Sequence, residues 1–466
     1  MNEKEKNKTQ IYSVKEGVIA NIAIGSSDTF ISPFFITLKI SSFGLGLLSA
    51  ISNIIGPIFQ IIGSYLMKNK PRKEIIIKSV LFQSISYFLL GILTVLIFLK
   101  LEINIYWLIL IFSMYVGLGS LGGPAWISLI GDIIEKEKLG QFFAFRNSIG
   151  IIASTLAGVL TGLFLDSLKL FFKEFILLGF AFIFLFTSIL HFLRIFYFNK
   201  HYEPEFKIEP ENYFSFISFI KKLPKTNFGR FVIITSLISF AVNISGPYYN
   251  LYIFRDLQFS YIQFLILNIV VSLASFFTFS IWGKIIDHYG SVDVLRASSF
   301  LISLVPLLWF FTIFIDNNYL IFIFLIPVHI IAGIGWGGYG LATTSFLYTA
   351  VSRPKRHLCS AYSSLIAGFC TLVGAFLGSA LIEIFKFILP FNSIMFVSVI
   401  SGILRFIFSF MLLFLVKEPL EIRKSLFEAI KRDIIKIENF IVDFVKISIY
   451  EINPFKIISR YRKKRK

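Results

Sequence analysis

Long apolar runs separated by short polar connections fill most of the chain, from about residue 12 to about residue 416. Runs such as LLSAISNIIGPIFQIIGSYL (47–66) and FILLGFAFIFLFTSILHFL (175–193) match the roughly 20 residues that a helix needs to cross the hydrocarbon core of a bilayer. No segment alternates apolar and polar residues as barrel strands do, so we expect helical spans. The pattern predicts an all-α multi-pass membrane protein with twelve spans, centred near Asp28, Pro57, Tyr87, Val116, Ala153, Ile183, Asn243, Ser272, Leu304, Ile334, Val373 and Leu404.

The composition agrees with a membrane protein and excludes a soluble one. Hydrophobic residues make up 56% of the chain and charged residues 15%, which is more apolar surface than a soluble protein of this length could bury. The two cysteines, Cys359 and Cys370, fall in or beside one predicted span and indicate neither a disulfide nor a metal site. The chain has no glycine-rich loop with Walker A spacing, so we expect no cofactor and no use of ATP.

Lysine and arginine are unequally distributed between the two sides of the predicted bundle. With an even number of spans, most of the 45 basic residues fall on the side of the termini, and we therefore predict cytoplasmic termini in a cell-membrane protein. The net charge of +18 follows largely from this distribution, so it does not predict a nucleic-acid partner. The loops on the opposite side contain only Lys39, Lys100, Lys169, Lys173, Arg255 and Lys386.

An internal repeat divides the chain into two halves. A shift of 214 residues places Pro33 on Pro247. The repeat predicts two six-helix halves that enter the membrane in the same direction and are related by a pseudo-twofold axis along the membrane normal. A shift of 216 residues places one set of glycines on another, namely Gly117, Gly119, Gly122, Gly158 and Gly162 on Gly333, Gly335, Gly338, Gly374 and Gly378.

We accordingly divide the chain into an N-terminal half (1–197), a connector (198–228), a C-terminal half (229–416) and a tail (417–466). Prolines and mixed charge predict a cytoplasmic linker for the connector, with a short surface helix in its stretch YFSFISFIKKL. The tail repeats apolar residues every three or four positions and is otherwise basic, which predicts an amphipathic helix on anionic lipids of the inner leaflet. A partner-binding helix is the alternative.

The stretch WGKIIDHYGSVDVLR (282–296) forms the polar connection after the eighth span. Gly283, Asp287 and Gly290 stand in it at spacings of four and three residues. Gly283 would let two helices approach closely, Gly290 would permit a tight turn, and Asp287 could meet the positive end of a helix in the other half. We predict that these residues form part of a cytoplasmic gate.

The equivalent stretch after the second span, GSYLMKNKPRK (63–73), keeps Gly63 and basic residues that include Arg72. Met67 stands where the aspartate would be. We assign Gly63 and Arg72 to the same predicted gate.

Both loops resemble the loop signature of the major facilitator superfamily, and the resemblance extends over roughly residues 12–418. The passages PAWISLIGDIIEKEKLGQFFAFRNSIG and NISGPYYNLYIF are also similar to helix segments of that superfamily. The resemblance implies transport by alternating access, with Arg146 and Asn147 at the start of the fifth span as gate residues on which Asp287 docks. The helix-4 arginine typical of proton-driven members and the glycine-proline pair typical of drug antiporters are absent.

One carboxylate lies in the middle of the first span. Asn21, Gly25, Asp28 and Ser32 follow one another at spacings of four, three and four residues, which places them on one helical face. A lone carboxylate at this depth costs a few kcal/mol or more unless it faces a polar cavity or takes up a proton. We therefore expect Asp28 to accept a proton or contact substrate. A structural carboxylate capped by serine and asparagine neighbours is the alternative.

Other polar and aromatic residues of the spans are candidates for a substrate cavity. For the amides the alternative is hydrogen bonding between helices, and for the aromatic rings it is packing. Arg405 in the last span is expected to face inward, with His329 as a candidate partner. The cavity candidates besides Asn21, Asp28 and Ser32 are Asn53, Asn243, Tyr248, Tyr249, Asn250, Asn268 and Trp336.

Together these features predict a monomeric secondary transporter that moves a small-molecule substrate across the cell membrane, with proton coupling through Asp28. A multidrug or metabolite efflux pump is the alternative within this class. A non-transporting sensor or a lipid scramblase is the alternative of another class. We do not expect an enzyme, because the predicted loops contain no acid pair, nucleophile triad or metal cluster.

Overall fold

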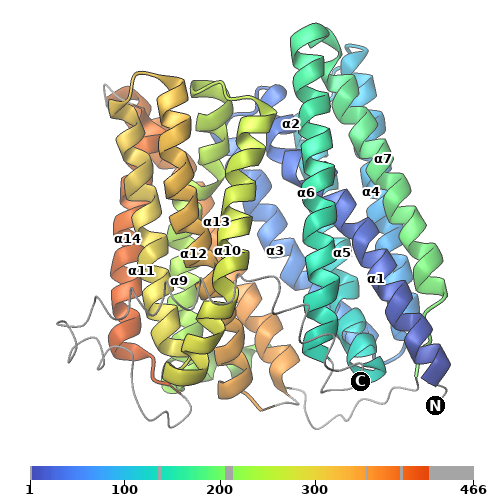
Figure 1. The fold of residues 1–466 in the computed structure, drawn as a ribbon. Helices are drawn as coiled ribbons and strands as arrows, with labels where there is room; N and C mark the ends of the chain where they lie inside the picture. Colours follow the sequence, from blue (N-terminus) through green and yellow to red (C-terminus); the bar gives the residue numbers. More distant parts are fainter. Residues whose placement is uncertain (1–2, 135–138, 205–213, 353–354, 389–391, 419–466) are drawn as a thin grey trace, which may run out of the picture.

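The computed structural model describes residues 3–134, 139–204, 214–352, 355–388 and 392–418 (Figure 1). The predicted tail helix lies outside these residues. The described elements are α1 (Glu3–Ser26), η1 (Asp28–Phe30), α2 (Ile31–Thr37), α3 (Ser42–Leu66), α4 (Arg72–Phe98), α5 (Ile105–Ile133), α6 (Leu139–Phe171), η2 (Lys173–Phe175), α7 (Ile176–Asn199), α8 (Phe216–Lys222), η4 (Leu223–Lys225), α9 (Asn227–Leu251), η5 (Tyr252–Asp256), α10 (Tyr261–Tyr289), α11 (Ser291–Phe310), η6 (Phe311–Phe314), α12 (Asn318–Ala350), α13 (Arg356–Ile388) and α14 (Ser393–Leu415).

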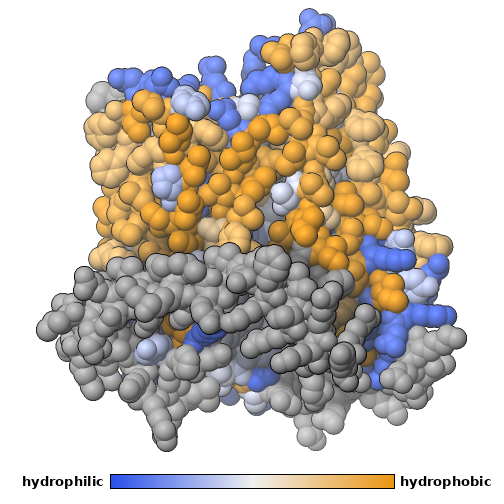
Figure 2. Space-filling view, viewed as in Figure 1, coloured by the Kyte–Doolittle hydropathy of each residue, from blue (hydrophilic) through white to orange (hydrophobic). Residues whose placement is uncertain are grey.

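The described residues contain twelve helical spans that are long and apolar enough to cross a membrane. Each span includes one of the predicted centres, so the prediction of an all-helical multi-pass membrane protein is confirmed. The short helix expected in the connector is also present as α8. Hydrophobic residues cover much of the described surface between a hydrophilic upper rim and hydrophilic groups at the lower right (Figure 2). This is the surface expected of a protein surrounded by lipid.

The first span of each half departs from a regular α-helix. In the N-terminal half α1 ends at Ser26, and the chain continues through η1 into α2. Pro33 lacks the N–H that a continuous helix would use to bond the carbonyl four residues earlier. In the C-terminal half α9 contains Pro247 and continues as the π-helical turn η5. The break in the N-terminal half places Asp28 at the start of η1.

Helix packing follows the predicted twofold relation. The N-terminal half packs α3 on α5, α4 on α5 and α7, and α1 on α6 and α7. The C-terminal half repeats these pairs as α10 on α12, α11 on α12 and α14, and α9 on α13 and α14. Between the halves, α3 packs on α13 and α6 on α10, two pairs that the pseudo-twofold axis exchanges. The two six-helix halves are therefore structural repeats.

Four of the repeated glycines occupy equivalent helix contacts. In α5, Gly117 faces α3 and Gly119 faces α4. In α12, Gly333 faces α10 and Gly335 faces α11, which are the matching helices of the other half. A Cβ atom at any of the four would meet atoms of the neighbouring helix. The sequence repeat thus records close packing in both halves.

The halves share an apolar core at their upper ends in Figure 1 and have separate cores at the lower ends, where the N-terminus lies. The upper cluster joins buried residues of both halves, including Phe34 and Tyr248. The buried residues of one lower cluster all belong to α4, α5, α7 and the turn after α5, whereas those of the other lie between Phe219 and Val416. Near the upper end, Gly162 of α6 faces Ile262 of α10, and the two helices diverge below that point (Figure 1).

Candidate functional site

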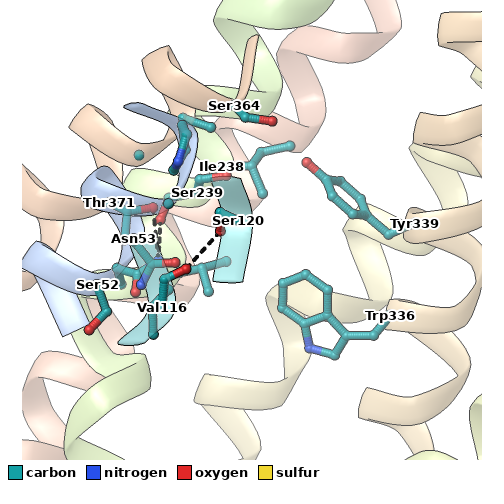
Figure 3. Close-up of a pocket in the computed structure, with 16 residues that line it drawn as sticks. Ser52, Asn53, Val116, Ser120, Ile238, Ser239, Trp336, Tyr339, Ser364 and Thr371 are labelled. Atoms are coloured by element: carbon teal, nitrogen blue, oxygen red, sulfur yellow. Dashed lines mark hydrogen bonds between the residues drawn. The ribbon is translucent and has the colours of Figure 1, made fainter. Parts of the chain in front are cut away.

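A cavity of about 450 Å³ lies between the two halves. Its walls come from α3 and α5 of the N-terminal half and from α9, α12 and α13 of the C-terminal half (Figure 3). A smaller cavity of about 280 Å³ shares Ser52 and Asn243 with it and extends to Ser32. The two cavities are therefore adjoining parts of one interior space. Small-molecule sites commonly have volumes of about 300–1,000 Å³.

The larger cavity has an aromatic wall and a polar wall. Trp336 and Tyr339 of α12 lie on one side, with ring centroids 5.7 Å apart and ring planes 81° to each other. Across the cavity from these rings, Figure 3 shows Asn53, Ser120 and Thr371 among the polar side chains. A solute in the cavity would therefore contact rings on one face and oxygen and nitrogen atoms on the other.

Helix geometry determines which atoms the polar wall presents. The side chains of Asn53, Ser120, Ser239 and Asn243 each donate a hydrogen bond to the carbonyl four residues earlier in the same helix, over 2.8, 2.9, 3.0 and 3.0 Å. Because a serine hydroxyl has one hydrogen and two lone pairs, a serine that donates to its own helix still presents acceptor capacity. The oxygen of an asparagine side chain remains an acceptor in the same way.

Asn243 connects three helices at the centre of this space. Its Oδ1 accepts from Ser49 Oγ of α3 at 3.5 Å, and its Nδ2 lies 3.4 Å from Thr371 Oγ1 of α13. Ser49 belongs to the opposite half. The amide therefore forms a polar contact across the interface between the halves, at the junction of the two cavities.

The predicted cavity residues fall into two groups. Ser32, Asn53, Asn243 and Trp336 line the described cavities. The side chains of Asn21 and Asn268 instead bond to carbonyls of their own helices, each at 2.8 Å. The predicted residues that line neither described cavity are Asn21, Asp28, Tyr248, Tyr249, Asn250 and Asn268.

The two predicted tyrosines lie in the packed interior. Tyr248 is fully buried in the upper core, and its hydroxyl donates to the carbonyl of Ala375 in α13. The ring of Tyr249 packs on Trp309 with centroids 4.7 Å apart. Both positions show interhelical packing, which was the alternative considered from sequence.

Asp28 lies in the N-terminal half, beside the cavity walls but not among them. Its carboxylate accepts hydrogen bonds from the hydroxyls of Tyr87 on α4 and Tyr115 on α5, the latter at 3.0 Å. The ring of His191 on α7 stacks on Tyr87 with centroids 5.8 Å apart. The half-buried carboxylate is therefore held by tyrosines of two neighbouring helices, and the serine and asparagine caps considered from sequence are not its described partners.

A buried ion cluster lies below Asp28 in the same half. The carboxylate of Glu16 is 1% exposed and pairs with Arg146 Nη2 at 2.8 Å and with Arg194 Nε at 3.3 Å. Arg194 Nη1 lies 2.9 Å from His191 Nδ1. Since arginine can only donate, Nδ1 is the acceptor and the proton of a neutral His191 ring is on Nε2. The sequence analysis missed Glu16, Tyr87, Tyr115 and Arg194, because only the fold brings these helices together.

The described gate candidates contact their own halves. Arg72 pairs with Asp132 at 2.5 Å and lies 3.8 Å from Glu203, so it joins the start of α4 to the end of α5 and to the segment after α7. Arg146 contacts Glu16 and the face of Trp126. The side chains of Asp287 and Asn147 lie outside the described residues, and docking between them stays a prediction.

The three gate glycines differ in their surroundings. Gly63 packs against the backbone of Leu121 on α5, so a close helix approach occurs there. Gly290 has φ 94°, a conformation that favours glycine, and ends α10 with the expected turn. Among the described residues, no atom lies within 4 Å of a Cβ built at Gly283, so the close approach expected at this residue is wrong for the described conformation.

Arg405 is buried in the C-terminal half without a carboxylate among its described contacts. Its guanidinium bonds Ser401 Oγ and Ser245 Oγ at 3.1 Å, and the carbonyls of Val242 and Ile302 at 3.2 and 3.3 Å. The expected pairing with His329 is wrong, since that ring bonds the carbonyl four residues earlier in its own helix. Backbone and hydroxyl oxygens instead compensate the buried charge in part.

Several residues of the cavity wall were not predicted from the sequence. Serine is common in the spans, so a single serine carried no signal of a cavity. The internal repeat did carry a signal for Ser120, because the shift of 216 residues places Ser120 on the predicted cavity residue Trp336. The polar and aromatic residues of the larger cavity that were not predicted are Ser52, Ser120, Ser239, Tyr339, Ser364 and Thr371.

Two repeated helical halves around a polar cavity in a multi-pass bundle define a membrane transporter and not an enzyme. The chain belongs to the Major Facilitator Superfamily, whose family model matches residues 17–367. A search of curated proteins finds no match.

Solved structures with the same fold include the following three transporters, all at low sequence identity. The nucleoside transporter NupG aligns with a TM-score of 0.62 and 14% identity over 89% of this chain and 98% of that one. A bacterial homologue of the iron transporter ferroportin in an inward-facing state aligns with a TM-score of 0.62 and 13% identity over 87% of this chain and 98% of that one. A D-xylose-proton symporter aligns with a TM-score of 0.60 and 14% identity over 90% of this chain and 99% of that one. At these identities the likeness shows the fold alone.

Proposed function

We propose that the protein is a secondary active transporter that carries a small solute through the central cavity by alternating access. The observation that carries this proposal is the unequal closure of the two ends, with a shared apolar core above the cavity and separate cores below it. A rocking motion could exchange this arrangement for one that opens above, because both halves are self-contained bundles. The distribution of basic residues supports a cytoplasmic lower face, and the described conformation would then be inward-facing.

In the opposite conformation the lower ends of the halves would approach each other. The loop around Asp287 and the start of α6 at Arg146 are the predicted contacts in that state. Glu16 already holds Arg146 at 2.8 Å in the described state, so Arg146 can share its guanidinium between this carboxylate and a second one.

We further propose that Asp28 carries the coupling proton. The support is its place at the helix break, in a half-buried site where two hydroxyls can stabilise the charged form. A carboxylate at this depth is costly and marks a candidate proton site in membrane proteins. Both tyrosine hydroxyls can also accept a hydrogen bond, so the same site can hold a protonated Asp28 after the hydroxyls turn.

The test is flux through purified protein in proteoliposomes. A panel of nucleosides, monosaccharides, amino acids, organic acids and hydrophobic cations is added while an internal dye reports pH. With one proton per solute, a gradient of two pH units would sustain about 100-fold accumulation, since each unit is worth about tenfold. Asp28→Asn should abolish accumulation and leave solute exchange intact, and Asp256→Asn is the matched control. Full accumulation by Asp28→Asn refutes proton coupling at this residue, and absence of flux for the whole panel refutes transport of these solutes.

A further inference from the structure

The central cavity contains recognition chemistry that the family assignment does not specify. Among the residues that the structure describes, no charged side chain lines either part of the cavity. A charged solute would lose hydration there without gaining an ion-pair partner. The lining therefore favours a polar solute without net charge.

The hydrogen-bonding state of the polar wall favours solutes that donate hydrogen bonds. The side chains of Asn53, Ser120, Ser239 and Asn243 donate to their own helices, and Asn243 Nδ2 also donates to Thr371 Oγ1 of α13. The wall consequently presents acceptor oxygens to the cavity. A solute with hydroxyl or amino hydrogens would find several acceptors there, and the indole N–H of Trp336 and the hydroxyl of Tyr339 can donate to its oxygen atoms.

One buried charge near the cavity disfavours cations. Arg405 donates to the carbonyl of Val242, a residue of the cavity wall, so a guanidinium lies directly behind α9. Its positive charge opposes a second cation inside the cavity. The carboxylate of Asp28 cannot replace an acidic wall residue, because it does not line the cavity and is bonded to Tyr87 and Tyr115.

The aromatic wall adds a preference for a ring. Trp336 projects toward the polar side chains in Figure 3, with Tyr339 beside it. An indole face buries a ring of a solute and leaves the edge groups of that ring free for hydrogen bonds. We propose that the cavity binds an uncharged, ring-containing solute with several hydroxyl or amino donors, the chemistry that nucleosides and monosaccharides share. This inference rests on the proposed transport function.

The test measures binding to the purified full-length protein by thermal shift, with uridine and D-glucose as uncharged probes. Uridine 5′-monophosphate, glucose 6-phosphate and choline serve as charged counterparts. We expect at least one uncharged probe to raise the melting temperature in a saturable manner and the charged probes not to do so. The two uncharged arms separate a nucleoside site from a sugar site. Stabilisation by a charged probe alone, or by none of the probes, overturns the proposal.

Variants connect the binding to the two walls. Trp336→Ala should weaken binding of the active probe by about 5- to 150-fold, the range of one lost aromatic stack, while Trp336→Phe should retain most of the affinity. Asn53→Ala should weaken it by about 2- to 10-fold. The matched control is Asn268→Ala, which removes an amide outside the cavity. A thermal melt without ligand would show whether Trp336→Ala is unfolded. In that case the probe affinities of Trp336→Phe and Asn53→Ala decide whether the two walls bind the solute.

The charge argument has a separate variant. Arg405→Met removes the buried guanidinium with a side chain of similar length, and should allow choline to bind more tightly than it does to the wild type. An unchanged choline affinity in a folded Arg405→Met protein contradicts the role given to Arg405. Binding of an uncharged probe without its flux in proteoliposomes would leave the solute class standing and remove the transport function. Flux of charged solutes alone would leave the transport function standing and overturn the proposed solute class.

Discussion

At the upper end of the bundle, a carboxylate from one half caps a helix of the other. Asp166 of α6 accepts hydrogen bonds from the backbone N–H groups of Tyr261 and Ile262 at the start of α10, each at 2.9 Å. These N–H groups belong to the first turn and lack partners inside the helix. The negative charge also lies at the positive end of the helix dipole. Asp166→Ala should therefore destabilise the upper-closed conformation.

The size of the effect follows from the two bonds. A hydrogen bond to a charged group contributes about 1.5–3 kcal/mol, and replacement of an N-terminal cap costs about 0.5–2 kcal/mol. Asp166 is only half-buried and water reaches it, so we take about 2 kcal/mol for the two hydrogen bonds together. This energy corresponds to about a 30-fold shift of the conformational equilibrium toward the upper-open conformation. Asp166→Asn keeps one acceptor oxygen and should lose about half of that energy.

The assay is labelling of a cavity cysteine from the upper face. Cys359 and Cys370 are replaced by serine, and Ser32→Cys places a thiol in the smaller cavity. A membrane-impermeant maleimide, applied to vesicles of each orientation, should label this thiol from the upper face about 30-fold faster after Asp166→Ala.

Asp256→Ala is the matched control for this assay. Asp256 also lies at an upper helix end, but it bonds Asn392 of its own half at 2.7 Å. We expect it to leave the labelling rate near that of the parent. Equal labelling rates for Asp166→Ala and Asp256→Ala would refute the argument that the Asp166 cap holds the upper ends together.

Two further predictions concern stability. Gly378→Ala would place a Cβ 2.8 Å from Tyr248 and against the carbonyl of Ile244, and should lower the free energy of unfolding by about 1–3 kcal/mol. Gly246→Ala is the control, because its Cβ would meet no described atom within 4 Å, and it should be neutral or slightly stabilising. Equal melting temperatures for the two variants would contradict this. Burial lowers the pKa of His201 below its usual value near 6.5. At pH values near and below 6.5 the unfolded chain therefore binds more protons than the folded one, and the free energy of unfolding should fall as the pH falls. His201→Gln should weaken this dependence in melts between about pH 7.5 and pH 5.5, and an unchanged profile would count against it.

Span positions could be predicted from the sequence because the bilayer leaves little choice. An apolar run of about 20 residues in lipid must bond its own backbone, so length and hydropathy predict a helix without knowledge of its neighbours. The glycine repeat added information about packing, since Gly117 and Gly333 mark equivalent close contacts. The side-chain pairing of Arg405 could not be predicted in this way. Backbone carbonyls of two other helices hold its guanidinium, and a carbonyl carries no signature in the sequence.

The candidate site was most predictable where a residue is costly in lipid. Asp28 stood out because an isolated carboxylate in a span requires compensation. Its partners Tyr87 and Tyr115 did not, because tyrosine is tolerated at many membrane positions and only the tertiary fold determines which hydroxyls meet the carboxylate. Ser120 was missed because serine is common in the spans, although it lines the same cavity as the predicted Trp336.

Asp28 and the cavity are separate sites, and one short segment of chain connects them. Asp28 begins η1, and Ser32, one turn further on, lines the smaller cavity. Between them Phe30 packs on Tyr261 and Phe264 of α10, with ring centroids 6.2 and 6.5 Å apart, in the upper core that joins the halves. If Asp28 binds the coupling proton, a shift of this segment would act on the solute site and on the upper closure together. Coupling would then need no contact between the proton and the solute, because both would bias the position of the same turn.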